Sequence, residues 1–275
     1  FKPMAAFTVS SISSGMYTQV DLILVGFLGT TTMVGLYQLV VKIKNLCATA
    51  VNSVGNVMLP RLSYYESRGG RDKTIRLKAE NLDFLTSAGI TLMSILSLCA
   101  RPMVLIQGGE DFAGSIIPWV LVSPALLFAS ANTMLSQYLV ATGRERAYAA
   151  VNFSGLIVAV IYGLLLIPRF GISGASMSVV ACEFTALVIR MVLLRSFLHE
   201  ASHYLDTHKI LISGLLAFVP SFAVADLIKT SVFIELIVPS LTYCACIVVL
   251  LALIKESFIT AVLSGIFRHF RIDRH

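Results

Sequence analysis

The stretch QVDLILVGFLGTTTMVGLYQLVVKI, residues 19–43, decides the fold of this chain. It consists of two apolar arms separated by Gly29-Thr30-Thr31-Thr32, and a glycine followed by clustered threonines between apolar segments is typical of a turn. Followed outward, the arms become the mostly apolar segments 5–28 and 33–59. Each is long enough to cross a bilayer, which takes roughly 20 residues of helix. We therefore predict a transmembrane helical hairpin.

The same pattern continues to the end of the chain. Six further spans are expected at 82–103, 113–139, 147–168, 172–195, 209–228 and 231–254. The composition agrees, since 57% of the 275 residues are hydrophobic and 13% are charged, against about 25% charged in a soluble domain. These values exclude an ordinary soluble enzyme and a disordered or fibrous protein. They predict an all-α polytopic membrane protein with about eight transmembrane helices.

The basic residues collect on one side of the predicted bundle. In a soluble protein the net charge of +6 would suggest nucleic-acid binding, but here we interpret it as loop charge and expect no nucleic-acid partner. Cytoplasmic loops are rich in Lys and Arg, so both termini are predicted to be cytoplasmic, with the tail 255–275 either lying on the inner leaflet as a basic amphipathic helix or solvated. The other side receives only Arg101, Arg169 and Lys229. The cytoplasmic side receives sixteen basic residues: Lys2, Arg61, Arg68, Arg71, Lys73, Arg76, Lys78, Arg144, Arg146, Arg190, Arg195, Lys209, Lys255, Arg268, Arg271 and Arg274.

The second span carries a polar stripe. Residues three and four apart share a helix face, and a ribbon that includes a lysine predicts the wall of a hydrated cavity. A seam of interhelical hydrogen bonds is the alternative. Lys44 lies about 200° around the helix from Lys42, so we expect it to snorkel or to pair with a partner elsewhere. The stripe comprises Gln38, Lys42, Asn45, Thr49, Asn52 and Asn56.

Acidic residues lie at similar depths in other predicted spans. Asp21 follows Tyr17 on a stripe of the first span, at a depth that differs from that of Lys42 by only about 6 Å. One interpretation is an Asp21–Lys42 ion pair; the other is that Asp21 binds a coupling Na⁺ or H⁺ while Lys42 meets an anionic substrate. Glu183 in the sixth span is either another cation site or a hydrogen-bonded structural carboxylate. Arg190 is expected to snorkel to the cytoplasm.

The sequence contains no catalytic constellation, metal motif or nucleotide-binding loop. His199 and His203 lie four residues apart in a predicted cytoplasmic loop and are interpreted as a solvated helix face rather than a metal site. The five cysteines lie in apolar stretches without ligand spacing. We therefore expect a protein that is not an enzyme, binds no metal and requires no cofactor beyond a coupling ion.

Two motifs resemble a known family. The first is the opening stretch, with Asp21 before a short turn and VGLY starting the next helix. The second is VATGRERAYAAVNFSGLIVAVIYGLLLIPRFGISGAS, residues 140–176, with a short basic loop, Asn152 early in the helix and an IPRFGI turn. Their order over most of residues 1–195 resembles the polysaccharide biosynthesis and O-antigen flippases of the multidrug/oligosaccharidyl-lipid/polysaccharide exporter superfamily.

The resemblance implies a larger transporter in the bacterial inner membrane, with two six-helix lobes facing each other across a central cavity and working by ion-coupled alternating access. Residues 1–198 would be the second lobe, 199–254 two additional helices and 255–275 a cytoplasmic tail, with the first lobe missing from this chain.

The resemblance also implies a substrate and a site. The substrate would be an undecaprenyl-pyrophosphate-linked oligosaccharide, an O-antigen or exopolysaccharide unit, moved among membrane lipids. Lys42 would contact the pyrophosphate, while Asp21 and Asn152 would belong to a cation site. Two alternatives stay open: a cation-coupled multidrug or metabolite exporter of the same superfamily, and an inactive membrane fragment.

Overall fold

The computed structural model describes residues 19–67, 71–228 and 231–253, and all regular elements in these ranges are helices. A helix over Gln19–Leu28 comes first. It is followed by α2 (Thr31–Ser67), α3 (Arg71–Leu98), α4 (Ala100–Gly108), the 3-10 helix η1 (Glu110–Ser115), α5 (Ile116–Ala141), α6 (Glu145–Leu193), α7 (Arg195–Ala201), α8 (Thr207–Leu227) and α9 (Val232–Leu253). The predicted all-α class is confirmed.

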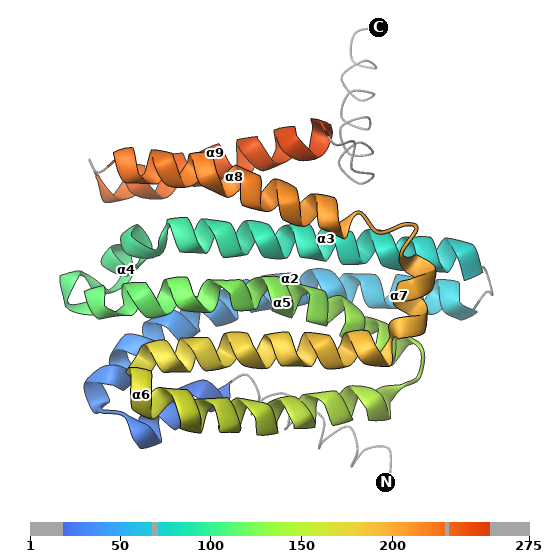
Figure 1. Ribbon diagram of the computed structural model, residues 1–275, viewed down its shortest axis with the longest axis horizontal. Coiled ribbons are helices and arrows are strands. Elements are labelled where there is room, and N and C mark those ends of the chain that lie inside the picture. The colour runs from blue at the N-terminus through green and yellow to red at the C-terminus, as the bar shows by residue number, and fades with distance from the viewer. Residues whose placement is uncertain (1–18, 68–70, 229–230, 254–275) are drawn as a thin grey trace, which may run out of the picture.

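The long element α6 is a hairpin of two helical legs. Its backbone leaves the helical region at Gly171, where φ is 59° and ψ is −135°, a conformation that residues with a Cβ rarely adopt. Figure 1 shows the two legs lying side by side on either side of this bend. They correspond to the spans predicted at 147–168 and 172–195, so the turn predicted from Pro168 and Gly171 is present.

Six helices in the described ranges are long and apolar enough to cross a membrane, and α6 counts once among them although it contains two legs. The described part of the first predicted span is the short apolar helix Gln19–Leu28. The predicted span 82–103 is displaced, because its apolar segment is Ile75–Leu98 and α4 begins a separate short helix at Ala100. The chain is a multi-pass membrane protein. The predicted amphipathic tail lies outside the described residues.

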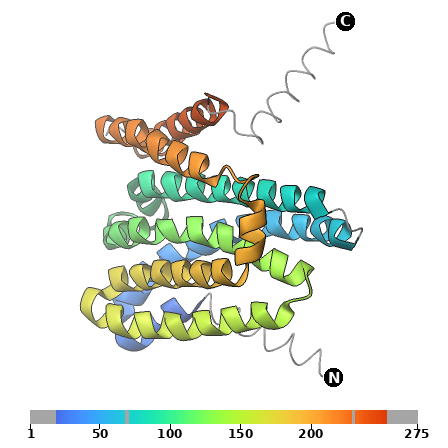
Figure 2. The same ribbon diagram turned by 45° about the vertical axis from the view of Figure 1, so that its right-hand side comes forward.

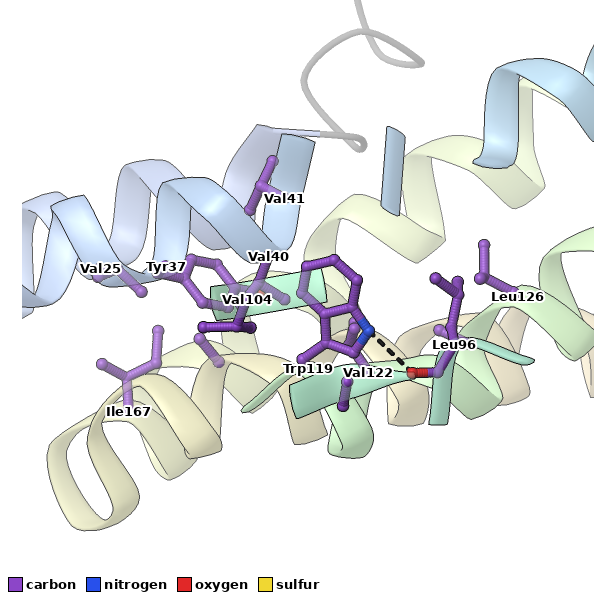
Figure 3. Packing of buried hydrophobic residues seen from close by; sticks show 13 residues of the cluster. Val25, Tyr37, Val40, Val41, Leu96, Val104, Trp119, Val122, Leu126 and Ile167 are labelled. Atoms are coloured by element: carbon purple, nitrogen blue, oxygen red, sulfur yellow. Dashed lines mark hydrogen bonds between the residues drawn. The ribbon is translucent and has the colours of Figure 1, made fainter. Parts of the chain in front are cut away.

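The main core joins the first helix to α2–α6. Figure 3 shows Trp119 of α5 packed among side chains that include Val40, Val104 and Leu96, with its indole N–H donating to the Leu96 carbonyl oxygen at 3.0 Å. Trp119 is buried, so this hydrogen bond satisfies its polar atom inside the apolar core. We call the body formed by Gln19–Leu28 and α2–α6 the lobe.

The α8–α9 hairpin packs along α3 at one edge of the lobe (Figures 1 and 2). Polar contacts hold it at both ends. At one end, Asp83 of α3 accepts hydrogen bonds from the Asp206 N–H, at 2.7 Å, and from the Thr207 hydroxyl, and these bonds tie the start of α8 to α3. At the other end, Arg101 of α4 donates to both carboxylate oxygens of Glu235 in α9, at 2.7 and 3.0 Å.

Candidate functional site

Three side chains from the first two helices form a buried polar cluster inside the lobe. Tyr37 donates its hydroxyl to Asp21 Oδ2 at 2.9 Å, and the Lys44 ammonium lies 2.7 Å from the same oxygen. Asp21 is 4% exposed and Tyr37 is fully buried. The second carboxylate oxygen, Oδ1, is buried and makes no hydrogen bond with any described residue. We call these three residues the Asp21 cluster.

The lysine that pairs with Asp21 is Lys44, so of the two interpretations given for Asp21 and Lys42, the ion pair was wrong. The reason is the angle around α2. Tyr37 and Lys44 are seven residues apart, almost two full turns, and therefore share the face that packs on the first helix. Lys42 lies about 140° from Tyr37 on this helix and is exposed. Of the two alternatives given for Lys44, snorkelling or pairing with a partner, the structure shows the pairing.

A cavity of ≈ 70 Å³ lies beside the Asp21 cluster. Asp21, Lys44 and Asn45 line it from one side, and Ser178 and Glu183 of the second α6 leg line it from another. We call it the inner cavity. The structure thus brings Asp21 and Glu183, the two acidic side chains for which a cation site was one interpretation, to one small cavity.

A second polar cluster joins α5 to both legs of α6. Asn132 of α5 donates its amide to Glu183 Oε2 at 2.8 Å and accepts at Oδ1 from Arg190, at 2.9 Å. Arg190 also donates to Asn152 Oδ1 on the first α6 leg, at 2.9 Å. An amide thus separates the carboxylate from the guanidinium along this chain of hydrogen bonds. We call these four residues the Arg190 cluster.

Arg190 does not snorkel as expected. It is only 6% exposed, because the amide oxygens of two asparagines on neighbouring helices accept from its guanidinium inside the bundle. Asn152 was expected beside Asp21 in a cation site. It bonds instead to Arg190, and of the two cavities it lines only the second, described next.

A larger cavity of ≈ 370 Å³ lies between α2, α5 and α6. The polar stripe of α2 enters it, where Thr133 donates to Asn52 Oδ1 at 2.9 Å and Gln137 donates to Asn56 Oδ1 at 3.1 Å. From the first contact to the second, α2 and α5 both advance by four residues. The two helices therefore run parallel and are joined by two hydrogen bonds about one helical turn apart. We call the four residues the amide ladder and the space beside them the amide cavity.

The close approach of α2 and α5 depends on a glycine. A Cβ at Gly55 would lie 2.6 Å from Thr133 Cγ2, well inside van der Waals contact. The absence of a side chain at Gly55 therefore lets the two helices approach to hydrogen-bonding distance at the ladder.

Only part of the polar stripe predicted on α2 lines a cavity and bonds to a neighbouring helix. The half containing Asn52 and Asn56 forms both the interhelical seam and a cavity wall, which were posed as alternatives. Gln38 and Lys42 line neither of the two cavities. Tyr17 lies outside the described residues. The exposed members are Gln38, Lys42, Thr49, Asn52 and Asn56, whereas Asn45 is half-buried.

Sequence reasoning missed Tyr37 and Asn132 as site residues. Tyr37 is the last residue of the VGLY motif, and its position seven residues before Lys44 was the available signal. Asn132 gave no such signal, because its partners come from other helices. Among the described residues, no group of three His, Cys, Asp or Glu side chains is placed to hold a metal ion.

No family model matches the chain. In sequence it is 22% identical over 163 residues to the capsular polysaccharide biosynthesis protein CapF of Staphylococcus aureus, covering 56% of this chain and 39% of that protein. It is 23% identical over 193 residues to a putative O-antigen transporter of Shigella dysenteriae, covering 69% and 46%. It is 24% identical over 201 residues to the uncharacterized membrane protein MJ1068 of Methanocaldococcus jannaschii, covering 72% and 39%. The chain thus spans less than half the length of these relatives.

Two solved structures share the fold. The lipid II flippase MurJ, in an inward closed conformation, superposes with a TM-score of 0.77 at 14% identity, over 91% of this chain and 53% of that one. An outward-facing multidrug resistance MATE family transporter of the MOP superfamily gives 0.57 at 14% identity, over 90% and 63%. The predicted resemblance to polysaccharide biosynthesis and O-antigen transport proteins is confirmed by the sequence relatives, and the fold is shared with a lipid II flippase and a multidrug transporter.

Proposed function

We propose that this chain forms one lobe and two additional helices of a flippase that moves a polyprenyl-pyrophosphate-linked oligosaccharide across the bacterial inner membrane. The observation that carries the proposal is the set of charged and amide side chains lining cavities inside a membrane bundle. Such residues are costly within a membrane and mark transport pathways. The names of the two relatives that have an assigned role support a glycan-lipid substrate over other cargo.

In this proposal Lys42 contacts the pyrophosphate of the substrate. Its ammonium is exposed on α2, whereas the neighbouring Lys44 is held by Asp21. An exposed lysine on a face that a second lobe would cover suits a phosphate as a point charge. The same proposal includes a second lobe that faces this one and supplies further basic residues to the cavity. It also places both termini of this chain in the cytoplasm.

Coupling to Na⁺ or H⁺ would operate at the inner cavity. Asp21 Oδ1 has no hydrogen-bond partner among the described residues, while Oδ2 holds the Lys44 ammonium. A proton or sodium ion on this carboxylate would weaken its hold on Lys44, because the two cations compete for one negative charge. Glu183, which accepts a hydrogen bond from Asn132, is the second acidic group that lines this cavity.

The test is transport in a strain that lacks its own flippase, using the gene product that carries this chain. Restored surface glycan, lost in Asp21→Asn and retained in the matched Asp111→Asn variant, is expected. Asp111 lies in η1 and lines neither of the two cavities, so it controls for removal of a carboxylate. Normal glycan in Asp21→Asn would contradict the coupling site. No glycan with any lipid-linked oligosaccharide would contradict the function.

A cation-coupled exporter of the same superfamily is the second candidate. The specific observation in its favour is that Asp21 and Glu183 line one cavity, because acidic residues suit cationic cargo. Export of cationic dyes by a protein that fails with every glycan would favour it.

A further inference from the structure

The amide cavity differs from the inner cavity in chemistry as well as in size. Its walls carry the amide ladder together with Ser136 and Tyr148, all neutral side chains. The two charged residues that reach it, Glu183 and Arg190, have opposite signs and belong to one hydrogen-bonded cluster. The cavity therefore presents no net charge to a ligand, which makes it a poor site for pyrophosphate or for a cationic drug.

The ladder leaves hydrogen-bonding groups available in this cavity. Its two rungs use the carbonyl oxygens of Asn52 and Asn56 as acceptors. Within the part of the chain that the structure describes, the amide nitrogens of these two asparagines and the carbonyl oxygen of Gln137 make no hydrogen bond. The α2 side of the ladder thus offers two amide donors, and the α5 side offers one carbonyl acceptor.

This chemistry matches a neutral ligand rich in hydroxyl groups. An amide offers both a donor and an acceptor, and a hydroxyl can accept from one and donate to the other. Tyr148 adds an aromatic ring with a polar tip, which can pack against the C–H face of a sugar ring. The volume of ≈ 370 Å³ lies within the range of small-molecule sites.

We propose that the amide cavity is a subsite for neutral sugar units of the transported glycan, and that Gln137, Asn52 and Asn56 read their hydroxyl groups. The proposal rests on the proposed function and adds the part of the substrate that this site recognises. In this arrangement Lys42 meets the pyrophosphate on the exposed face of α2, and the amide cavity meets the sugar.

The experiment compares two probes on the purified protein in lipid nanodiscs. One is a short-chain polyprenyl pyrophosphate carrying a neutral disaccharide, and the other is the same lipid without sugar. The sugar-bearing lipid is expected to bind about tenfold more tightly, as one or two well-placed hydrogen bonds allow. Gln137→Met should abolish this preference without changing the affinity for the sugarless lipid. Gln107→Met, the same replacement on α4 outside both cavities, should leave the preference intact.

The outcomes separate the subsite from the function. Equal affinity of the two lipids in the unaltered protein overturns the subsite, while restored glycan in the cellular assay would still support the flippase. Equal weakening of both lipids by Gln137→Met also overturns the subsite, because it shows the ladder to be structural only. Failure of both lipids to bind overturns the subsite and contradicts the function.

Discussion

The two halves of α2 are held to the lobe by opposite kinds of contact. The half near its start is fixed by charge, through Lys44 on the buried carboxylate of Asp21. The half near Asn56 is fixed by neutral hydrogen bonds to α5, brought close by Gly55. Both halves belong to one continuous helix, so a change at one end can be transmitted to the other.

The two kinds of contact indicate which half of α2 can change its attachment to the lobe when an ion or a proton binds. A buried ion pair loses much of its solvation in forming, and its net stability is sensitive to any ion or proton that replaces one partner. A ladder of amides has no charge to titrate and responds little to ions. We therefore expect the Lys44 half to respond to a coupling cation while the ladder half stays attached to α5.

The largest expected effect comes from breaking the charged half. The Lys44 side chain is only 12% exposed, so Asp21→Ala leaves a largely buried ammonium without its carboxylate, which should lower the free energy of unfolding by about 3–5 kcal/mol. Equilibrium unfolding in detergent followed by circular dichroism measures the loss. Adding Lys44→Met to Asp21→Ala should recover more than half of it, because the unpaired charge is then gone. A double variant no more stable than the single one would show that the pair is not the source.

A smaller loss of stability is expected when α2 and α5 are forced apart at the ladder. Gly55→Ala places a Cβ 2.6 Å from Thr133 Cγ2 and should destabilise the protein by about 1–3 kcal/mol in the same assay. Gly35→Ala on the same helix meets no atom within 4 Å and is the matched control, expected to be neutral or slightly stabilising. Equal effects at both glycines would mean that the close contact at Gly55 does not matter.

The sequence predicted the helices better than their partners. Spans follow from apolar length, and the bend in α6 was readable from Pro168 and Gly171, because these signals are local. The pairing of Asp21 with Lys44 required knowing which face of α2 packs on the first helix. The periodicity of the stripe shows where its polar face lies but not which neighbour the opposite face meets.

Arg190 shows the same limit more sharply. Its position near the predicted cytoplasmic end favoured snorkelling, and nothing within its own span contradicted this. Its burial depends on Asn132 and Asn152, which are 58 and 38 residues away in the chain. A single polar residue in one helix cannot reveal that two amides from other helices will meet it.

A still smaller effect is expected from the ladder itself. A double-mutant cycle with Asn56→Ala and Gln137→Ala should give a coupling of about 0.6 kcal/mol, the usual value for hydrogen bonds between membrane helices. The cycle measured on Asp21 and Lys44 should be several times larger, because charge is involved. Similar coupling at the two ends would remove the distinction between a switchable half and a fixed half of α2.

The smallest expected change in stability is at Lys42, and it tests what the exposed face of α2 meets. A lysine against lipid near mid-membrane costs about 2.5–3.5 kcal/mol, so Lys42→Leu would stabilise the protein by an amount of that order if this face met lipid. Since we expect the face to meet water and substrate, the free energy of unfolding should change by no more than about 0.5 kcal/mol. Lys44→Leu, two residues away, should destabilise strongly because it leaves the Asp21 carboxylate buried without its cation. A large stabilisation by Lys42→Leu would contradict the hydrated face and remove Lys42 from the proposed pyrophosphate site.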